Sequence, residues 1–276
     1  MPRVSVMDDS TLDLAAYRDR IGWHAAASAD LATLAALLAA HMRTIPFENL
    51  DVLLGRGVSL DLGALQAKLV AARRGGYCFE HATLFAAVLE ALGFAARRHI
   101  ARVIVVTPRD LAPRTHAFLT VAIGGARYVV DPGFGSLAPT SPLPLVDGAR
   151  VCVNDVEHWM ARDGDSWKLV MRSDGEVTEC WISPLEEDPD VDFEMGNHFT
   201  ATWPLSPFVN RLLMRALTPD GRVSLMNRDV TVRRGTAVER RQLADRAELR
   251  ALIAAHFGFD LPAVERVRIP GVPEWT

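Results

Sequence analysis

Cys78 is placed in this sequence where it could act as a nucleophile. It follows Arg74-Gly75-Gly76-Tyr77 and begins an apolar pattern with helical spacing, so we expect it in the first turn of a helix. Unpaired backbone N–H groups and the positive end of the helix dipole favour a thiolate at that position. This placement predicts a cysteine that is primed as a nucleophile. The alternative is a buried structural cysteine, which is the commoner role of a lone cysteine.

A nucleophilic thiol needs a general base, and the sequence offers eight histidines. If Gly124 and Gly125 form a two-residue hairpin turn, the strand register places His116 on the same face as Asp131. The three residues would then form a Cys-His-Asp triad, in which the carboxylate orients the imidazole. His81, one turn further along the expected helix, is the weaker alternative because its line of approach to a substrate is poor.

Other interpretations of these residues stay open. A three-residue turn would put Asp131 on the opposite face of the hairpin. His116 could be an ordinary core histidine, with Asp131 capping the turn that follows it. Cys152 and Cys180 lack the glycine pair and the helix start, so we interpret both as structural.

The elements that must position these residues change character along the chain. Three- and four-residue apolar spacing predicts helices over 12–21, 30–42, 62–70 and 77–92. From residue 95 the period becomes two, which predicts strands over 100–106, 117–123, 128–131, 167–172 and 177–182. Beyond an acidic, proline-bearing stretch near 190 we expect a short helix or turn, strands around 212–217, 223–226 and 230–234, and a closing helix over 246–257.

These patterns predict an α+β fold in three parts. Residues 1–94 would form a helical part that carries the cysteine. Residues 95–190 would form a mostly antiparallel β part that carries the histidine and the aspartate, and residues 191–276 would form the last part.

Composition excludes several classes of protein. The 276 residues are 49% apolar and 23% charged, which is typical of a globular chain. A net charge of −4 without a basic stripe argues against a nucleic-acid partner. Three cysteines without CxxC spacing favour a reducing cytoplasm and suggest no metal site. Because we find neither a signal peptide nor a long apolar run, we expect no membrane partner, and the oligomeric state stays open.

Four motifs resemble those of the arylamine N-acetyltransferases. In chain order they are Pro46-Phe47-Glu48-Asn49, Arg74-Gly75-Gly76-Tyr77-Cys78, Thr115-His116 and Asp131-Pro132-Gly133-Phe134-Gly135. The likeness continues through 202–208 and 257–258, so it covers nearly the whole chain. It implies a helical bundle, a central antiparallel β-barrel and a C-terminal α/β lid around a Cys-His-Asp core similar to that of cysteine proteases.

The resemblance also implies an activity. Cys78 would be the nucleophile, His116 the base and Asp131 the orienting carboxylate. An acetyl group would pass from the cosubstrate acetyl-CoA to the cysteine, and then to an arylamine, hydrazine or arylhydroxylamine, in a ping-pong reaction. Within the same fold, an amide synthase acting on a larger acyl chain is the first alternative. A papain-like or transglutaminase-like cysteine hydrolase is a second, and a catalytically inactive binding module is a third.

The resemblance assigns roles to further residues. Phe47, Phe134 and Phe208 match positions that line the substrate pocket in relatives, although each alone would more often be a core residue. Glu48 matches an acid that pairs with Arg74, which we interpret as a clamp on the cysteine loop.

Two residues depart from the family pattern. Ala82 stands where relatives usually have asparagine, four residues after the cysteine. Pro132 replaces a small apolar residue and removes a backbone N–H beside the triad acid. Both put the rate and the acyl preference in question, and neither removes a member of the triad.

Overall fold

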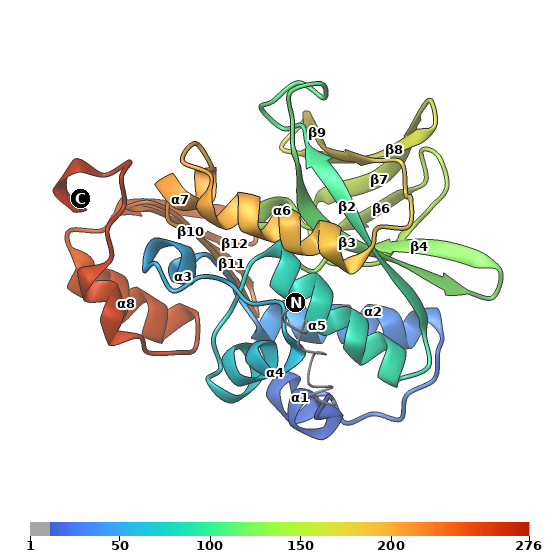
Figure 1. The fold of residues 1–276 in the computed structure, drawn as a ribbon, viewed down its shortest axis with the longest axis horizontal. Coiled ribbons are helices and arrows are strands. Elements are labelled where there is room, and N and C mark those ends of the chain that lie inside the picture. The colour runs from blue at the N-terminus through green and yellow to red at the C-terminus, as the bar shows by residue number, and fades with distance from the viewer. Residues whose placement is uncertain (1–11, 276) are drawn as a thin grey trace, which may run out of the picture.

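The first part of the chain forms helices, as its apolar periodicity predicts. The computed structural model describes residues 12–275 (Figure 1). The N-terminal segment, where we expect no signal peptide, lies outside the described residues. Asp30 caps the second helix by accepting a hydrogen bond from the Thr33 backbone N–H at 2.8 Å. The helices are α1 (Leu14–Ile21), α2 (Leu31–Thr44), α3 (Leu50–Leu53), α4 (Leu62–Leu65), a π-helical turn (Gln66–Ala71) and α5 (Cys78–Ala91).

The middle of the chain forms an eight-stranded antiparallel sheet. A bridge between Asp147 and Met160 joins the segment after β5 to β7, which curls the sheet into a nearly closed barrel. In spatial order the strands are β5 (Leu143–Pro144), β4 (Ala126–Val130), β3 (Arg114–Ile123), β2 (Ala95–Val103), β9 (Glu176–Ser183), β8 (Ser166–Ser173), β7 (Val156–Asp163) and β6 (Arg150–Val153).

A second antiparallel sheet, of five strands, forms most of the C-terminal part. Its first strand, β1 (Phe47–Glu48), comes from the helical part and pairs with β10. The remaining strands are β10 (Leu213–Thr218), β11 (Gly221–Met226), β12 (Asp229–Arg234) and β13 (Ala237–Gln242). The helices of this part are α6 (Asp190–Thr202), α7 (Pro207–Asn210) and α8 (Arg246–His256). The predicted α+β fold is therefore confirmed.

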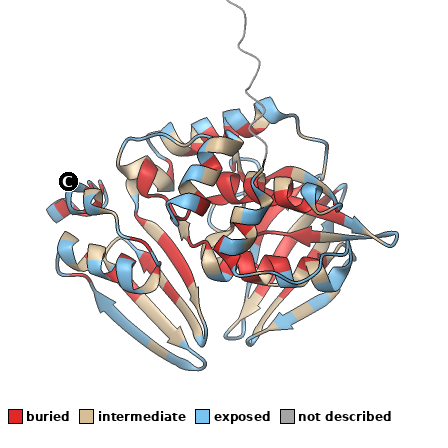
Figure 2. Ribbon diagram, turned by 90° about the horizontal axis from the view of Figure 1, so that it is seen from below, coloured by how far each residue is buried: buried red, intermediate tan, exposed pale blue. Residues whose placement is uncertain are grey.

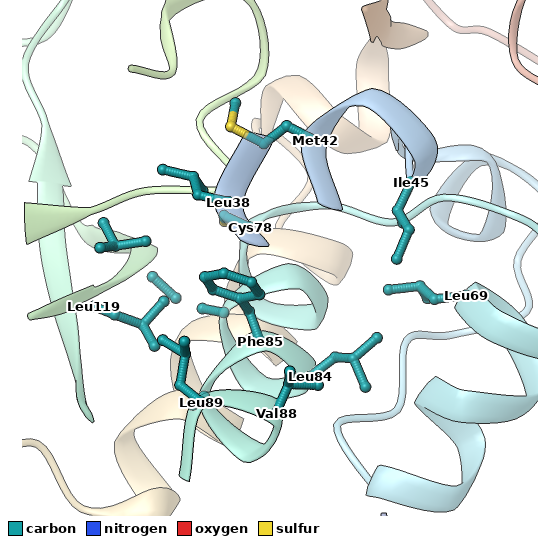
Figure 3. Packing of buried hydrophobic residues seen from close by; sticks show 14 of the residues in the cluster. Leu38, Met42, Ile45, Leu69, Cys78, Leu84, Phe85, Val88, Leu89 and Leu119 are labelled. Atoms are coloured by element: carbon teal, nitrogen blue, oxygen red, sulfur yellow. The ribbon is translucent and has the colours of Figure 1, made fainter. Parts of the chain in front are cut away.

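The helices lie across both sheets, and the buried residues gather where helices and strands face each other (Figure 2). Cys78 belongs to a core cluster in which α2, α5 and the barrel meet (Figure 3). The apolar pattern that begins at Cys78 faces the interior, because Ala82, Phe85 and Leu89 are each fully buried in that cluster. No helix of the described chain is both long enough and apolar enough to cross a membrane.

Some predicted elements were wrong in extent. The strand predicted over 100–106 is β2, which begins at Ala95 because Ala95 and its neighbours pair with β3 despite weak strand propensity. After Val103 the chain leaves the sheet, and Val106 is 89% exposed. The short helix or turn predicted after 190 is the 13-residue helix α6. Gly196 lies within this helix and allows close packing, because a Cβ there would lie 2.8 Å from the Phe79 ring.

The sequence analysis also missed five strands: β1, β5, β6, β7 and β13. β5, β6 and β7 lie between the strands predicted over 128–131 and 167–172. β13 is an edge strand whose residues are mostly polar and exposed, which hides its alternation. Cys152 lies on β6 and is exposed, so its interpretation as a structural core cysteine was wrong.

Candidate active site

Two of the sequence motifs meet around the start of α5. The Glu48 N–H donates to the Gly76 carbonyl at 2.8 Å, and the Gly76 N–H donates to the Pro46 carbonyl at 3.2 Å. A Cβ on Gly75 would lie 2.0 Å from the Pro46 oxygen, so this approach requires glycine. β1 therefore fixes the loop that delivers Cys78 to the helix.

A buried ionic network holds the same loop. Arg74 Nη2 lies 2.6 Å from Glu48 Oε1, which confirms the predicted clamp, and Arg74 Nη1 lies 2.7 Å from Asp51. Lys68 extends the network, with its Nζ 2.9 Å from Asp51 and 2.7 Å from Glu80. The other carboxylate oxygen of Glu80 accepts the Tyr77 N–H at 3.0 Å and so caps α5 directly before the cysteine. Sequence analysis found the Glu48–Arg74 pair and missed Lys68 and Asp51.

The hairpin of β3 and β4 has the register that the sequence predicts. Ile123 pairs with Ala126, so the turn is Gly124-Gly125, and both glycines have positive φ. His116 and Asp131 consequently lie on one face, and His116 Nε2 is 2.8 Å from Asp131 Oδ2. The alternative three-residue turn is excluded.

The three predicted catalytic side chains lie together and are almost completely buried. Cys78 Sγ lies 3.7 Å from the carbonyl oxygen of Thr115, the residue directly before His116, and Cys78 is one of the groups that raise the pKa of His116. Since Nε2 of His116 is occupied by Asp131, Nδ1 is the nitrogen left for the thiol. Burial alone lowers the pKa of His116, but the Asp131 carboxylate and the bonds to Asp131 and Cys78 outweigh it and raise the pKa to about 10. These contacts therefore favour the charged form of the imidazole.

Asp131 has partners that the sequence analysis did not identify. Trp181 on β9 donates its indole N–H to Asp131 Oδ2 at 2.9 Å, and the Gly133 N–H donates to Oδ1 at 3.3 Å. Trp181 is fully buried and stacks on Phe118 with 4.1 Å between ring centroids. The carboxylate is thus held on both oxygens before it orients His116. No local motif marks Trp181, because only the barrel brings it to this hairpin.

Gly133 also lets the Asp131 loop approach Cys78 closely. A Cβ there would lie 2.6 Å from Cys78 Cα, so any larger residue would push the loop and the helix apart.

Ala82, one of the two departures from the family pattern, lies fully buried in the core cluster. Cys180 is buried as predicted for a structural cysteine, and burial raises the pKa of its thiol to about 12.

His81 is engaged elsewhere and does not serve the site. Its Nδ1 lies 2.8 Å from His41 Nε2, and its Nε2 lies 3.3 Å from the Pro46 carbonyl. His41 Nδ1 is in turn 2.7 Å from the Tyr17 hydroxyl. Because the Pro46 carbonyl can only accept, the direction of all three hydrogen bonds is fixed. Tyr17 donates to His41, His41 donates to His81, and His81 donates to Pro46. Every group is then satisfied with both imidazoles neutral. Burial lowers the pKa of His81 to about 4 and that of His41 well below its usual range.

This histidine pair predicts a loss of stability in acid. Its folded-state pKa values are lowered, so unfolded histidine binds protons first and the stabilising effect is lost as the pH falls from about 6.5 toward 4. At pH 7 we expect His81→Gln to lower the free energy of unfolding. That deficit relative to wild type should shrink by about 2–3 kcal/mol over the same pH window. Urea unfolding of both proteins at several pH values measures it, and a pH-independent deficit would contradict the neutral pair.

A cleft of about 870 Å³ opens onto the triad between the two sheets. Cys78, His116 and all three predicted phenylalanines line it. The Phe134 ring lies 4.6 Å from the His116 ring between centroids, and Phe47 and Phe208 lie 6.2 Å apart. The cleft can therefore hold a flat apolar group against the histidine. Further wall residues come from α6 and from strands β10 to β12, which the sequence analysis did not identify.

The chain is similar to known proteins over most of its length. A family model described as N-acetyltransferase matches residues 30–266. An arylamine N-acetyltransferase of Escherichia coli (strain K12) is 41% identical over 88% of this chain and 87% of its own. The solved structure of a Mycolicibacterium smegmatis arylamine N-acetyltransferase has a TM-score of 0.86, 41% identity, and coverage of 91% of this chain and 93% of its own. The Mycobacterium marinum arylamine N-acetyltransferase in complex with CoA has a TM-score of 0.86, 35% identity and coverage of 91% and 94%.

Proposed function

The chain belongs to the arylamine N-acetyltransferase family and is an acyltransferase, and we propose that it works through a thioester on Cys78. The acetyl group would come from acetyl-CoA and pass to an arylamine, hydrazine or arylhydroxylamine. The observation that carries this proposal is that Cys78 and His116 line one cleft, with His116 hydrogen-bonded to Asp131 at 2.8 Å. A reducing compartment such as the cytoplasm suits a site that needs this free thiol.

In the first half-reaction the Cys78 thiolate attacks the carbonyl carbon of acetyl-CoA. The C–S bond to CoA breaks as the new C–S bond forms, and His116 gives its proton to the departing CoA sulfur. The products are free CoA and an acetylated cysteine beside a neutral imidazole. Asp131 stabilises the imidazolium before this step and keeps the ring oriented after it.

In the second half-reaction the acceptor amine attacks the thioester carbon. Neutral His116 takes a proton from the amine nitrogen, and the Cys78 thiolate leaves, which restores the starting state. Phe47, Phe134 and Phe208 would hold the aryl ring and limit the access of water. The amine would then react faster than water does, which separates a transferase from a hydrolase.

Initial-rate kinetics should show this sequence of events. With acetyl-CoA and an aminobenzoate or hydrazine acceptor varied together, we expect parallel double-reciprocal lines, because CoA leaves before the acceptor reacts. Without acceptor, one equivalent of CoA thiol should be released quickly, and further release should be slow. Intersecting lines would contradict the ping-pong order, and equally fast CoA release without amine would indicate a hydrolase.

A further inference from the structure

Arg215 is a charged side chain buried in the wall of the cleft. It lies on β10, is only 6% exposed, and lines the cleft with Phe47 and Phe134. One guanidinium nitrogen donates to the Gly135 carbonyl, and Nε has no hydrogen-bond partner among the described residues. Across residues 12–275 no carboxylate forms an ion pair with it. A buried guanidinium with one neutral acceptor is an unfavourable arrangement unless an anion joins it.

The surroundings of Arg215 are positive. Burial, and after it the positive charge of Arg222 on β11, lower the pKa of Arg215 to about 9. Burial lowers the pKa of His158 too, and the charges of both arginines act in the same direction. Arg233, on the next strand, has Asp174 as a partner at 3.1 Å. The local field at Arg215 therefore favours a negatively charged ligand.

Two hydroxyl groups complete this corner of the cleft. Ser224 is directly opposite Arg215 in the β10–β11 pair, so their side chains share a face of the sheet. Ser136 Oγ lies 3.2 Å from Ser224 Oγ, and both serines line the cleft. A guanidinium beside two hydroxyl donors is suited to a carboxylate or phosphate oxygen pair.

This corner lies close to the reacting sulfur. Gly135, which accepts from Arg215, is two residues after Gly133, and two residues of chain span at most about 7 Å. Gly133 itself packs against the backbone of Cys78. The Phe134 ring lies between these two glycines in sequence and against His116 in space. A ligand with its reactive atom at Cys78 and its anion at Arg215 would therefore span about one aromatic ring.

We propose that Arg215, with Ser136 and Ser224, forms an anion subsite that binds the carboxylate of an aromatic amine acceptor. The proposal rests on the proposed acetyl transfer, and it makes Arg215 a specificity-determining residue of the second half-reaction. A phosphate of CoA offers the same oxygen chemistry. The position beside Phe134, one ring from the nucleophile, favours the acceptor.

Two matched substrate pairs test the subsite in wild type and in Arg215→Met. 4-Aminobenzoate and its methyl ester differ in the charge of the acceptor, whereas acetyl-CoA and S-acetylpantetheine differ in the phosphates of the donor. We expect Arg215→Met to lower the kcat/KM ratio of 4-aminobenzoate over its ester by about 10- to 100-fold, the usual size of lost charge-assisted hydrogen bonds. Comparing the ratio between proteins cancels the different nucleophilicities of the two amines.

Two variants serve as controls. Arg215→Lys keeps the charge and loses the fork of donors, so it should give an intermediate ratio. Arg240→Met removes a charge from an exposed residue of the same cross-strand row, outside the cleft, and should leave the ratio as in wild type. Acetylation of Cys78, followed by intact mass, reports separately whether each protein completes the first half-reaction.

The outcomes are distinct. Suppose that Arg215→Met instead lowers the kcat/KM ratio of acetyl-CoA over S-acetylpantetheine and leaves the ratio of 4-aminobenzoate over its ester unchanged. That result would overturn the carboxylate assignment and give the subsite to a CoA phosphate. No change in either ratio would overturn the subsite altogether. If Cys78 were not acetylated in any protein, the proposed function would fail; calorimetric binding of 4-aminobenzoate to the unmodified wild type and to Arg215→Met would still decide the subsite.

Discussion

Cys78→Ala should lose acetyl transfer almost completely, with a fall of at least about 10⁴-fold in kcat/KM, because the proposed mechanism carries the acetyl group on this sulfur. Cys78 is the first residue of α5 and lines the cleft together with His116. Turnover of acetyl-CoA with an arylamine acceptor, followed as released CoA thiol, measures the loss.

Matched cysteine variants make this result interpretable. Cys152→Ala removes an exposed thiol and should keep wild-type turnover. Cys78→Ser keeps the size of the side chain, so equal loss in the serine and alanine variants points to chemistry rather than to packing. Thermal unfolding of both should remain cooperative. Substantial turnover in either Cys78 variant would show that the nucleophile is another residue.

Asp131→Asn should have the second-largest effect, a fall of about 10³- to 10⁴-fold in kcat/KM. Burial lowers the pKa of His116, and the Asp131 carboxylate is the main group that raises it. An amide would remove that negative charge and offer a donor where Trp181 already donates. The positive charge on His116 would then be lost near neutral pH. Alkylation of Cys78 by iodoacetamide at pH 7, which reports the thiolate, should slow in parallel.

Two further variants separate orientation from general disruption. Trp181→Phe keeps the stacking on Phe118 and removes one hydrogen bond to Asp131, so we expect a loss of about 10-fold, in line with one bond to a charged group. Asp165→Asn, in an exposed turn, should behave as wild type. Unchanged alkylation and turnover in Asp131→Asn would remove Asp131 from the mechanism.

The triad geometry could be predicted because each part of it follows from local rules. A glycine pair before an apolar helical pattern predicts Cys78 at the start of α5, and a two-residue glycine turn fixes the register that brings His116 to Asp131. Both features depend on a few neighbouring residues. The family motifs add the three phenylalanines of the cleft, which no periodicity would distinguish from core residues.

The parts that could not be predicted depend on contacts between distant segments. Trp181 reaches Asp131 only because the barrel curls β9 back to the β3–β4 hairpin. Glycine is unfavourable inside a helix, and only the contact with the Phe79 ring explains why Gly196 lies within α6. Arg215 reads as one more charged residue of an amphipathic strand, and only the pairing of β1 with β10 places it in the cleft wall. Sequence spacing carries none of this information.

Intact-mass analysis of the protein mixed with acetyl-CoA alone tests the thioester most directly. The account predicts the addition of one acetyl group, located on Cys78 by peptide mapping and removed when an arylamine is added. The adduct should be missing from Cys78→Ala and present in Cys152→Ala. An unmodified wild-type protein that still turns over with amine present, or an adduct on Cys152 or Cys180, would contradict it.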